Sequence, residues 1–539
     1  MPATGRWTAA IGAALAARLE LRVHQLDDPE YWKQHTRRLQ LGVLRRNLTR
    51  ARSTEIGRAF GFAALAALPD DELLPAYRNA VPVRDYEGYR DACRRMREDG
   101  QRGVLWPGLV RDFAQTSGTT AGDKYMPVSR DMLRSNYLCS LDIFAHARRR
   151  GHRLSDLFAG RCLFLGGSSD LTTNAHGVNT GDLSGIVTPL ITWPISEVYS
   201  PGPEIALESH WPTKIDKMAR LSMTQDIRML SGMPSWAGVL MDRVLELTGA
   251  DRVADVWPNL RLFVHGGVRY DPFQHSLAQK YSAGQHDDLP DRLELYPASE
   301  AFVAIQDEPG DRGLRLCVDR SNFFEFVPAD QINTDQINTG QINSDAPDAR
   351  AAWEVEKNTR YVVVLSTCAG LFRYVLGDVV EFDTLADEGP VRLRIVGRHK
   401  HFINAFGENL IVEHIENAVA EAAAATGLAH GEFTAAPVYQ TQATRPGLEL
   451  AIETAAISPA ALAAFADRFD RSLKDQNADY ETKRTDSLGM APPTITPLAA
   501  GAFHRWLDDN NKLGGQHKCP RCANNRDLID QLTTPAGTP

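Results

Sequence analysis

The stretch FAQTSGTTAGDKYMP, residues 113–127, places small, hydroxyl and glycine residues between two apolar runs. Its lysine, Lys124, is followed by Tyr125 and an extended pattern, so the spacing is not that of the GxxxxGK[ST] loop, which opens a helix. The next helix is expected only after Ser129. The stretch therefore predicts a strand–loop–strand turn. Such a turn is either an ordinary surface loop or an anion-binding loop whose N–H groups and hydroxyls face a phosphate.

The composition is that of a globular protein with more than one domain. The 539 residues are 43% hydrophobic and 24% charged, and the net charge of −9 argues against a dedicated nucleic-acid binder. No apolar run reaches the length that spans a bilayer, and the alanine-rich residues 9–17 continue into charged residues, as an amphipathic helix does. Seven cysteines, an odd number, fit a reducing compartment. We therefore expect a cytoplasmic protein without a membrane or nucleic-acid partner.

The pattern of apolar residues changes twice along the chain. Residues 1–100 have helical periodicity, and from Arg161 onward short β-type runs alternate with helical stretches, which predicts a layered α/β domain. Beyond Gly397 comes a compact α+β pattern, with a helix over 412–426 and another that starts at Ser458. The predicted fold class is α/β: a large multi-layer N-terminal domain, residues 1–396, with β-sheets flanked by helices, and a smaller α+β C-terminal domain, residues 397–539.

A repeat interrupts the large domain. Residues 330–350 contain three Gln-Ile-Asn triplets at a period of five, which matches neither a strand nor a helix. This segment lies between two apolar β-type runs, so we interpret it as an inserted surface loop.

Two further segments carry residues suited to nucleotide chemistry. In LELYPASEAFVAI, Pro297 breaks an alternating run, so Glu300 is expected in a loop between strands, where its carboxylate suits Mg²⁺. In FRYVLGDVVEF, two β-type runs are joined by Gly377 and Asp378. That pair is either an ordinary turn or a fixed two-oxygen acceptor for a ribose diol.

The ordered set TSGTTAGDK, YPASE, FRYVLGD and GRHKHFI resembles the adenylate-forming superfamily of acyl-CoA synthetases, adenylation domains and luciferases. The segments SGMPSW, HGGVRYDPF, NFFEFVP and GAFHRWLDDNNKLGGQHKCPR make the chain more similar to the auxin-responsive acyl-acid amido synthetases, the Gretchen Hagen family, and their bacterial relatives. The resemblance covers residues 40–532.

The resemblance implies an AMP-forming ligase that uses ATP and Mg²⁺. A small-molecule carboxylic acid would be activated as an acyl-adenylate and transferred to an amino acid or other amine, and the small domain would rotate between the two steps. The protein would be a monomer or weak homodimer. The implied site residues are Thr116, Ser117, Gly118 and Thr119 for phosphate, Tyr296, Ala298 and Ser299 near the adenine, Asp378 for ribose, Glu300 for Mg²⁺, Arg398 at the hinge, and Lys518 at the α-phosphate.

The sequence departs from the family pattern in two places. Residues 407–409, Gly-Glu-Asn, stand where the plant members carry a lysine, so the lysine of the KxPR-like segment, Lys518, is the better catalytic candidate. Cys519 and Cys522 are a close pair, but no second CxxC pair lies nearby, which disfavours a zinc site. Two alternatives stay open: an acyl-CoA ligase using the same adenylate, and a non-catalytic binding protein that retains the fold.

Overall fold

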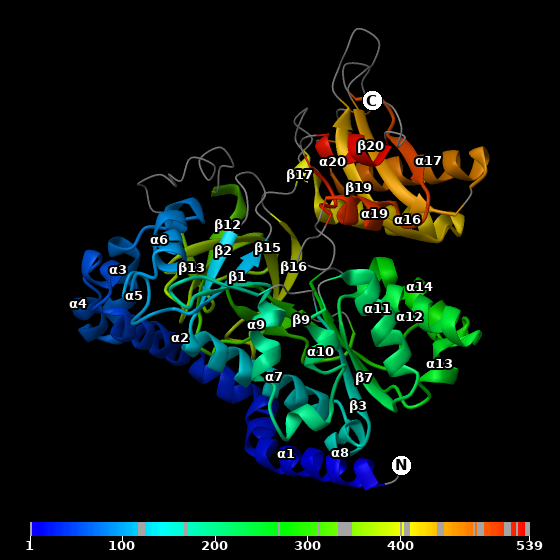
Figure 1. The fold of residues 1–539 in the computed structure, drawn as a ribbon. Helices are drawn as coiled ribbons and strands as arrows, with labels where there is room; N and C mark the ends of the chain where they lie inside the picture. Colours follow the sequence, from blue (N-terminus) through cyan, green and yellow to red (C-terminus); the bar gives the residue numbers. More distant parts are fainter. Residues whose placement is uncertain are drawn as a thin grey trace. The chain divides into compact units, whose positions relative to one another are not determined.

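The chain is shown in Figure 1 as a computed structural model. It describes residues 3–116, 124–166, 171–208, 210–267, 270–310, 313–331, 348–398, 402–403, 410–438, 447–455, 457–477, 480–481, 484, 490–510, 519–523 and 526–533. The described residues divide into two compact units: one spans 3–270 and 277–395, and the other contains 271–276 and the described residues from 396 onward. The Gln-Ile-Asn repeat lies almost entirely outside the described residues.

Helices dominate the first hundred residues, as predicted. The second of them begins where Asp28 accepts a hydrogen bond from the backbone N–H of Tyr31 and Pro29 occupies the first turn, a combination that favours a helix start. The helices are α1 (Ala3–Asp27), α2 (Pro29–Ala51), α3 (Glu55–Ala59), α4 (Phe62–Ala67), α5 (Asp70–Ala80) and α6 (Glu87–Glu98).

The opening stretch forms a hairpin in a small sheet. β1 (Asp112–Thr116) and β2 (Lys124–Val128) pair antiparallel, with Thr116 opposite Lys124. Helix α7 (Arg130–Arg149) begins directly afterwards, because the Ser129 side chain accepts a hydrogen bond from the N–H of Met132. The strand–loop–strand prediction is therefore confirmed for the strands and the helix start. β5 (Asn179–Gly181) and β4 (Thr172–Thr173) complete this sheet in the order β2-β1-β5-β4.

A twelve-stranded sheet forms the core of the first unit in the described part of the chain, in the order β13-β12-β14-β15-β16-β11-β10-β9-β8-β7-β3-β6. β6, β3, β7, β8 and β9 run parallel, whereas the pairings from β9 to β10, β11 and β16 are antiparallel. The strands are β3 (Arg161–Leu165), β6 (Tyr199–Ser200), β7 (Ile227–Gly232), β8 (Leu262–Gly266), β9 (Arg292–Pro297), β10 (Phe302–Ile305), β11 (Leu314–Leu316), β12 (Phe323–Pro328), β13 (Arg350–Ala351), β14 (Tyr361–Ser366), β15 (Tyr374–Thr384) and β16 (Arg392–Arg398).

Helices connect the parallel strands, which confirms the predicted α/β alternation (Figure 1). Among these helices, α12 (Pro234–Thr248) packs against α11 (Trp211–Ser222). The connecting elements are α8 (Leu154–Phe158), α9 (Leu183–Val187), η1 (Thr188–Leu190), η2 (Ile195–Glu197), α10 (Pro203–Ala206), α11 (Trp211–Ser222), α12 (Pro234–Thr248), α13 (Val253–Val256) and α14 (Asp271–Ser282), with η3 (Ala329–Gln331) after β12.

The second unit has the predicted α+β character. Its sheet has the order β19-β20-β21, and Ile415, Phe433 and Phe465 lie in its apolar core. The predicted helix over 412–426 and the predicted start at Ser458 are both confirmed. The elements are β17 (Phe402–Ile403), β18 (Leu410–Ile411), α16 (Val412–Thr426), β19 (His430–Val438), β20 (Gly447–Thr454), α17 (Pro459–Gln476), β21 (Thr494–Leu498), α19 (Ala502–Asp509) and α20 (Asp527–Thr533).

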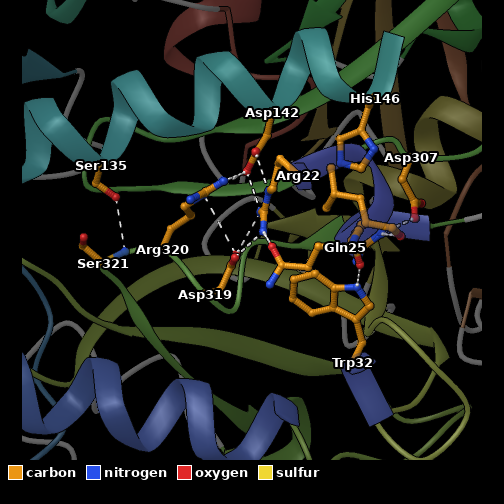
Figure 2. A network of polar contacts seen from close by, with 12 residues as sticks. Arg22, Gln25, Trp32, Ser135, Asp142, His146, Asp307, Asp319, Arg320 and Ser321 are labelled. Carbon is orange, nitrogen blue, oxygen red and sulfur yellow. Dashed lines mark hydrogen bonds and ion pairs between the residues drawn. The ribbon is translucent and has the colours of Figure 1, made fainter. Parts of the chain in front are cut away.

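A buried ionic network ties the N-terminal helix to the large sheet (Figure 2). The guanidinium of Arg22 on α1 pairs with Asp142 on α7 at 2.8 Å and with Asp319 beyond β11 at 2.5 Å, and Arg320 also pairs with Asp142. Removing one member of such a group leaves a buried charge without its partner, which typically costs about 3–5 kcal/mol. The network therefore fixes α1 and α7 against the sheet.

No helix in the described ranges combines the length and the apolar character needed to cross a membrane.

Candidate active site

The YPASE segment is a tight connection between two antiparallel strands. β9 ends at Pro297, the N–H of Ala298 donates to the carbonyl of Ala301 at 2.9 Å, and β10 follows at once. Ser299 and Glu300 lie in this connection and are buried, with Glu300 8% exposed. The prediction that Glu300 lies between strands is confirmed.

The FRYVLGD segment does not contain the turn that its Gly-Asp pair favours. Gly377 and Asp378 lie inside one continuous strand, β15, so that interpretation is wrong. The pairing with β14 is irregular here: Val375 faces Val364, Val379 faces Val362, and Gly377 has a φ of +90°. This β-bulge needs the conformational freedom of glycine and sets the direction of the Asp378 side chain.

The two segments meet through two crossed hydrogen bonds. The hydroxyl of Tyr296 in the first segment donates to Oδ2 of Asp378 in the second at 2.5 Å. The hydroxyl of Tyr374 in the second donates to Oε1 of Glu300 in the first at 3.1 Å. Each segment thus supplies a tyrosine and, four residues later, a carboxylate. We call these four residues the crossed tyrosine–carboxylate pairs.

The order of the strands in the sheet shows that these two hydrogen bonds depend on the tertiary structure. Between β9 and β15 lie β10, β11 and β16. Neighbouring strands are about 4.8 Å apart, so β9 and β15 would be roughly 19 Å apart in a flat sheet. The hydrogen bonds at 2.5 and 3.1 Å therefore require a strongly curled sheet. The crossed pairs join the two sides of that curl.

Burial keeps the Tyr374 hydroxyl protonated. The Tyr374 side chain is fully buried, and burial, reinforced by the adjacent Glu300 carboxylate, holds its pKa well above the ordinary value of 10. A protonated phenol donates a hydrogen bond to a carboxylate oxygen. The carboxylate of Glu300 is thereby oriented.

Arg373 supports the start of β15 and was not among the residues predicted from the sequence. Its backbone has a φ of +53°, and its buried guanidinium pairs with Glu325 at 3.0 Å and donates to the carbonyls of Arg78 and Val81. The signal in the sequence was the arginine in an otherwise apolar run, but its partner lies 48 residues away. These contacts therefore fix the backbone directly before Tyr374.

The predicted phosphate loop is only partly described. Thr116 ends β1 opposite Lys124, whereas Ser117, Gly118 and Thr119 lie outside the described residues. Helix α6 and the residue before it hold the start of β2: the Tyr86 hydroxyl accepts from the N–H of Tyr125 at 2.8 Å, and the Arg97 guanidinium lies 3.6 Å from the Tyr125 ring centroid. Thr116 belongs to the four-stranded sheet, not to the sheet of the crossed pairs.

The residues expected from the second unit are less defined. Arg398 is the last residue of β16, but its side chain is not among those described, and Lys518 lies outside the described residues. Cys522 is buried, and burial raises the pKa of its thiol well above the ordinary value. The described part of the chain contains no group of three or more Asp, Glu, His or Cys side chains arranged to hold a metal.

The described donor set fits a magnesium nucleotide. Glu300 supplies the carboxylate oxygen that a hard cation prefers, and Asp378 supplies an oriented acceptor for hydroxyl groups. Because Mg²⁺ usually binds one or two protein carboxylates together with nucleotide phosphates, a group of three protein ligands is not required.

Comparison with known proteins gives a family match along most of the chain. The models of the GH3 family N-terminal, central and C-terminal domains match residues 25–201, 315–398 and 413–527 in that order. The chain is 21% identical over 566 residues to indole-3-acetic acid-amido synthetase GH3.3 of Arabidopsis thaliana, covering 92% of this chain and 90% of that protein. It is 26% identical over 373 residues to jasmonoyl–L-amino acid synthetase GH3.5 of Oryza sativa subsp. japonica, covering 66% of this chain and 56% of that protein.

Solved structures show the same fold. The GH3.15 acyl acid amido synthetase superposes with a TM-score of 0.71 at 17% identity, covering 92% of each chain. A 2-hydroxyisobutyryl-CoA ligase in complex with 2-HIB-AMP superposes with a TM-score of 0.55 at 15% identity, covering 92% of this chain and 91% of that one. With three domain models of one family matching in order, the chain belongs to the GH3 family.

Proposed function

We propose that this protein is an ATP-dependent acyl-acid amido synthetase, which joins a carboxylic acid to the amino group of an amino acid. The observation that carries the proposal is the pair of buried carboxylates, Glu300 and Asp378, each oriented by a tyrosine of the other segment. The family membership supports it, because relatives named as amido synthetases align over most of this chain.

The reaction has two steps. In the first, the substrate carboxylate attacks the α-phosphorus of ATP, a P–O bond to the β-phosphate breaks, and pyrophosphate leaves. In the second, the amine attacks the acyl carbon, AMP leaves with the bonding electron pair of the acyl–oxygen bond, and the amine loses a proton. Two anions must approach in the first step, so the protein has to neutralise charge and align the reacting atoms.

Each predicted site residue has a role in this scheme. Bound Mg²⁺ supplies positive charge next to the phosphates. Glu300 holds that ion, Asp378 accepts from the ribose hydroxyls, and Tyr296, Ala298 and Ser299 border the adenine. The proposed phosphate and hinge contacts come from Thr116, Ser117, Gly118, Thr119, Arg398 and Lys518.

The proposal leaves the acid unassigned. The curated relatives are named for indole-3-acetic acid and jasmonoyl conjugation, which suggests compact organic acids as the first substrates to test. A cytoplasmic location and a monomer or weak homodimer stay predictions.

The test is an ATP–pyrophosphate exchange screen across carboxylic acids, followed by addition of single amino acids and mass measurement of the product. We expect acid-dependent exchange and a product whose mass equals acid plus amino acid minus water. A thioester formed with coenzyme A in place of the amide would identify the acyl-CoA ligase instead. Nucleotide binding without exchange for any acid would favour the non-catalytic binding protein.

A further inference from the structure

The crossed tyrosine–carboxylate pairs join two segments that are far apart in the chain. Tyr296 and Asp378 are 82 residues apart, and Tyr374 and Glu300 are 74 residues apart. Resting on the function proposed above, we propose that Tyr374 and Tyr296 are positioning residues with separate tasks: Tyr374 orients Glu300 toward the metal, and Tyr296 orients Asp378 toward the nucleotide.

Each of the two carboxylates accepts a hydrogen bond from a phenol. Tyr296 donates to Asp378 at 2.5 Å, and Tyr374 donates to Glu300 at 3.1 Å. Such a bond is directional, so it fixes the carboxylate oxygen that accepts it.

The two tyrosines connect the curled sheet to the two carboxylates of the site. Glu300 sits in a connection between strands, and Asp378 sits at a bulge, so neither carboxylate is directed by a regular strand alone. Each hydroxyl links its carboxylate to the strand on the far side of the curl. When the tyrosine hydroxyl is removed, the carboxylate keeps its backbone position but loses the hydrogen bond that orients one of its oxygens.

The two tasks predict different losses when each hydroxyl is removed. Mutation of a residue that orients a metal ligand typically lowers metal affinity or activity by about 10- to 100-fold. In Tyr374→Phe, the affinity for ATP measured with Mg²⁺ should fall about tenfold or more, whereas the affinity for ATP measured in EDTA should stay within about twofold. In Tyr296→Phe, both affinities should fall together, because Asp378 acts on the nucleotide and not on the metal.

Tyr361→Phe is the matched control. Tyr361 is buried in β14 of the same sheet, and its hydroxyl accepts from the N–H of Glu356 at 3.1 Å, away from both carboxylates. Both ATP affinities of this variant should match the wild type. Isothermal titration calorimetry gives the affinities, and thermal melts show that each variant is folded.

A second measurement ties the Tyr374 effect to its partner. Introduced into a Glu300→Gln background, Tyr374→Phe should change the Mg²⁺-dependent affinity by less than about twofold, because the oriented carboxylate is already gone. The same loss in both backgrounds would overturn the proposal. So would equal losses with Mg²⁺ and with EDTA in Tyr374→Phe, or no loss in a folded Tyr374→Phe.

The outcome also separates this inference from the proposed function. Wild-type protein that binds Mg²⁺-ATP but shows no acid-dependent exchange would overturn the synthetase function and leave the positioning roles to be decided by binding. Wild-type protein that binds no ATP would overturn both. Each tyrosine variant is interpreted by itself, so a misfolded variant does not prevent the other from deciding.

Discussion

Glu300 and Glu325 are both buried glutamates, but they have different partners. A tyrosine hydroxyl donates to Glu300, whereas Glu325 lies between the guanidinium groups of Arg373 and Arg78, both at 3.0 Å. We expect Glu300→Gln to abolish pyrophosphate exchange with little change in melting temperature. Glu325→Gln should lower the free energy of unfolding by about 3–5 kcal/mol, because it leaves Arg373 buried without its counter-charge. Urea melts and exchange assays on both variants test the contrast, and a similar loss of stability in both would contradict it.

His146 gives the pH dependence of stability a definite sign. Burial holds the pKa of its imidazole well below the ordinary 6.5, with a further lowering from Arg315 that outweighs the opposite effect of Asp307. Below pH 6.5, His146 therefore binds a proton in the unfolded chain but not in the folded chain. The free energy of unfolding consequently falls as the pH is lowered through that range. His146→Gln should lose less stability than the wild type between pH 7 and pH 5, by up to about 2 kcal/mol.

The unfolding free energies of the two proteins in urea at both pH values measure this difference. His146 also contacts Arg149 at 3.1 Å, so His146→Gln is expected to be less stable at both pH values. The comparison therefore concerns the slope with pH. Parallel losses in wild type and variant would assign the acid sensitivity to other groups.

At the scale of elements, the bulge in β15 links backbone conformation to the site. Gly377 has a φ of +90° and open space where a Cβ would stand, so Gly377→Ala costs conformational energy without a steric clash. The cost is about 1–2 kcal/mol for a left-handed conformation. Gly427, with a φ of +66° and similarly open space, ends α16 in the other unit and is the matched control. Both variants should melt lower, but only Gly377→Ala should weaken ATP binding. Unchanged ATP affinity in Gly377→Ala would show that the bulge does not direct Asp378.

In the whole molecule, the domain boundary near Gly397 is predicted to be the hinge about which the small domain rotates. If the small domain rotates between the two steps, the chain after β16 has to bend there. Limited trypsin digestion should therefore cut first at Arg398 or Lys400 and release fragments corresponding to residues 1–396 and 397–539 within a few residues. A first cut inside either unit, with the Gly397 region resistant, would contradict a hinge at this position. Slower cutting in the presence of ATP and acid would indicate that substrates restrict the bend.

Local signals determined what the sequence alone predicted correctly. Ser129 and Ser458 cap helices through hydrogen bonds to N–H groups three residues ahead, and Pro297 ends its strand, so each of these boundaries depends on a few neighbouring residues. The ordered motifs likewise identified the family and the candidate carboxylates. Only the tertiary structure shows that Gly377 and Asp378 form a bulge and that Arg373 pairs with Glu325. Only the tertiary structure shows that the hydroxyls of Tyr296 and Tyr374 each donate to the carboxylate of the other segment. The contacts of Arg373, Tyr374 and Tyr296 join residues 48, 74 and 82 positions apart, and those of the two tyrosines also cross a curled sheet. No short stretch of the chain contains that information.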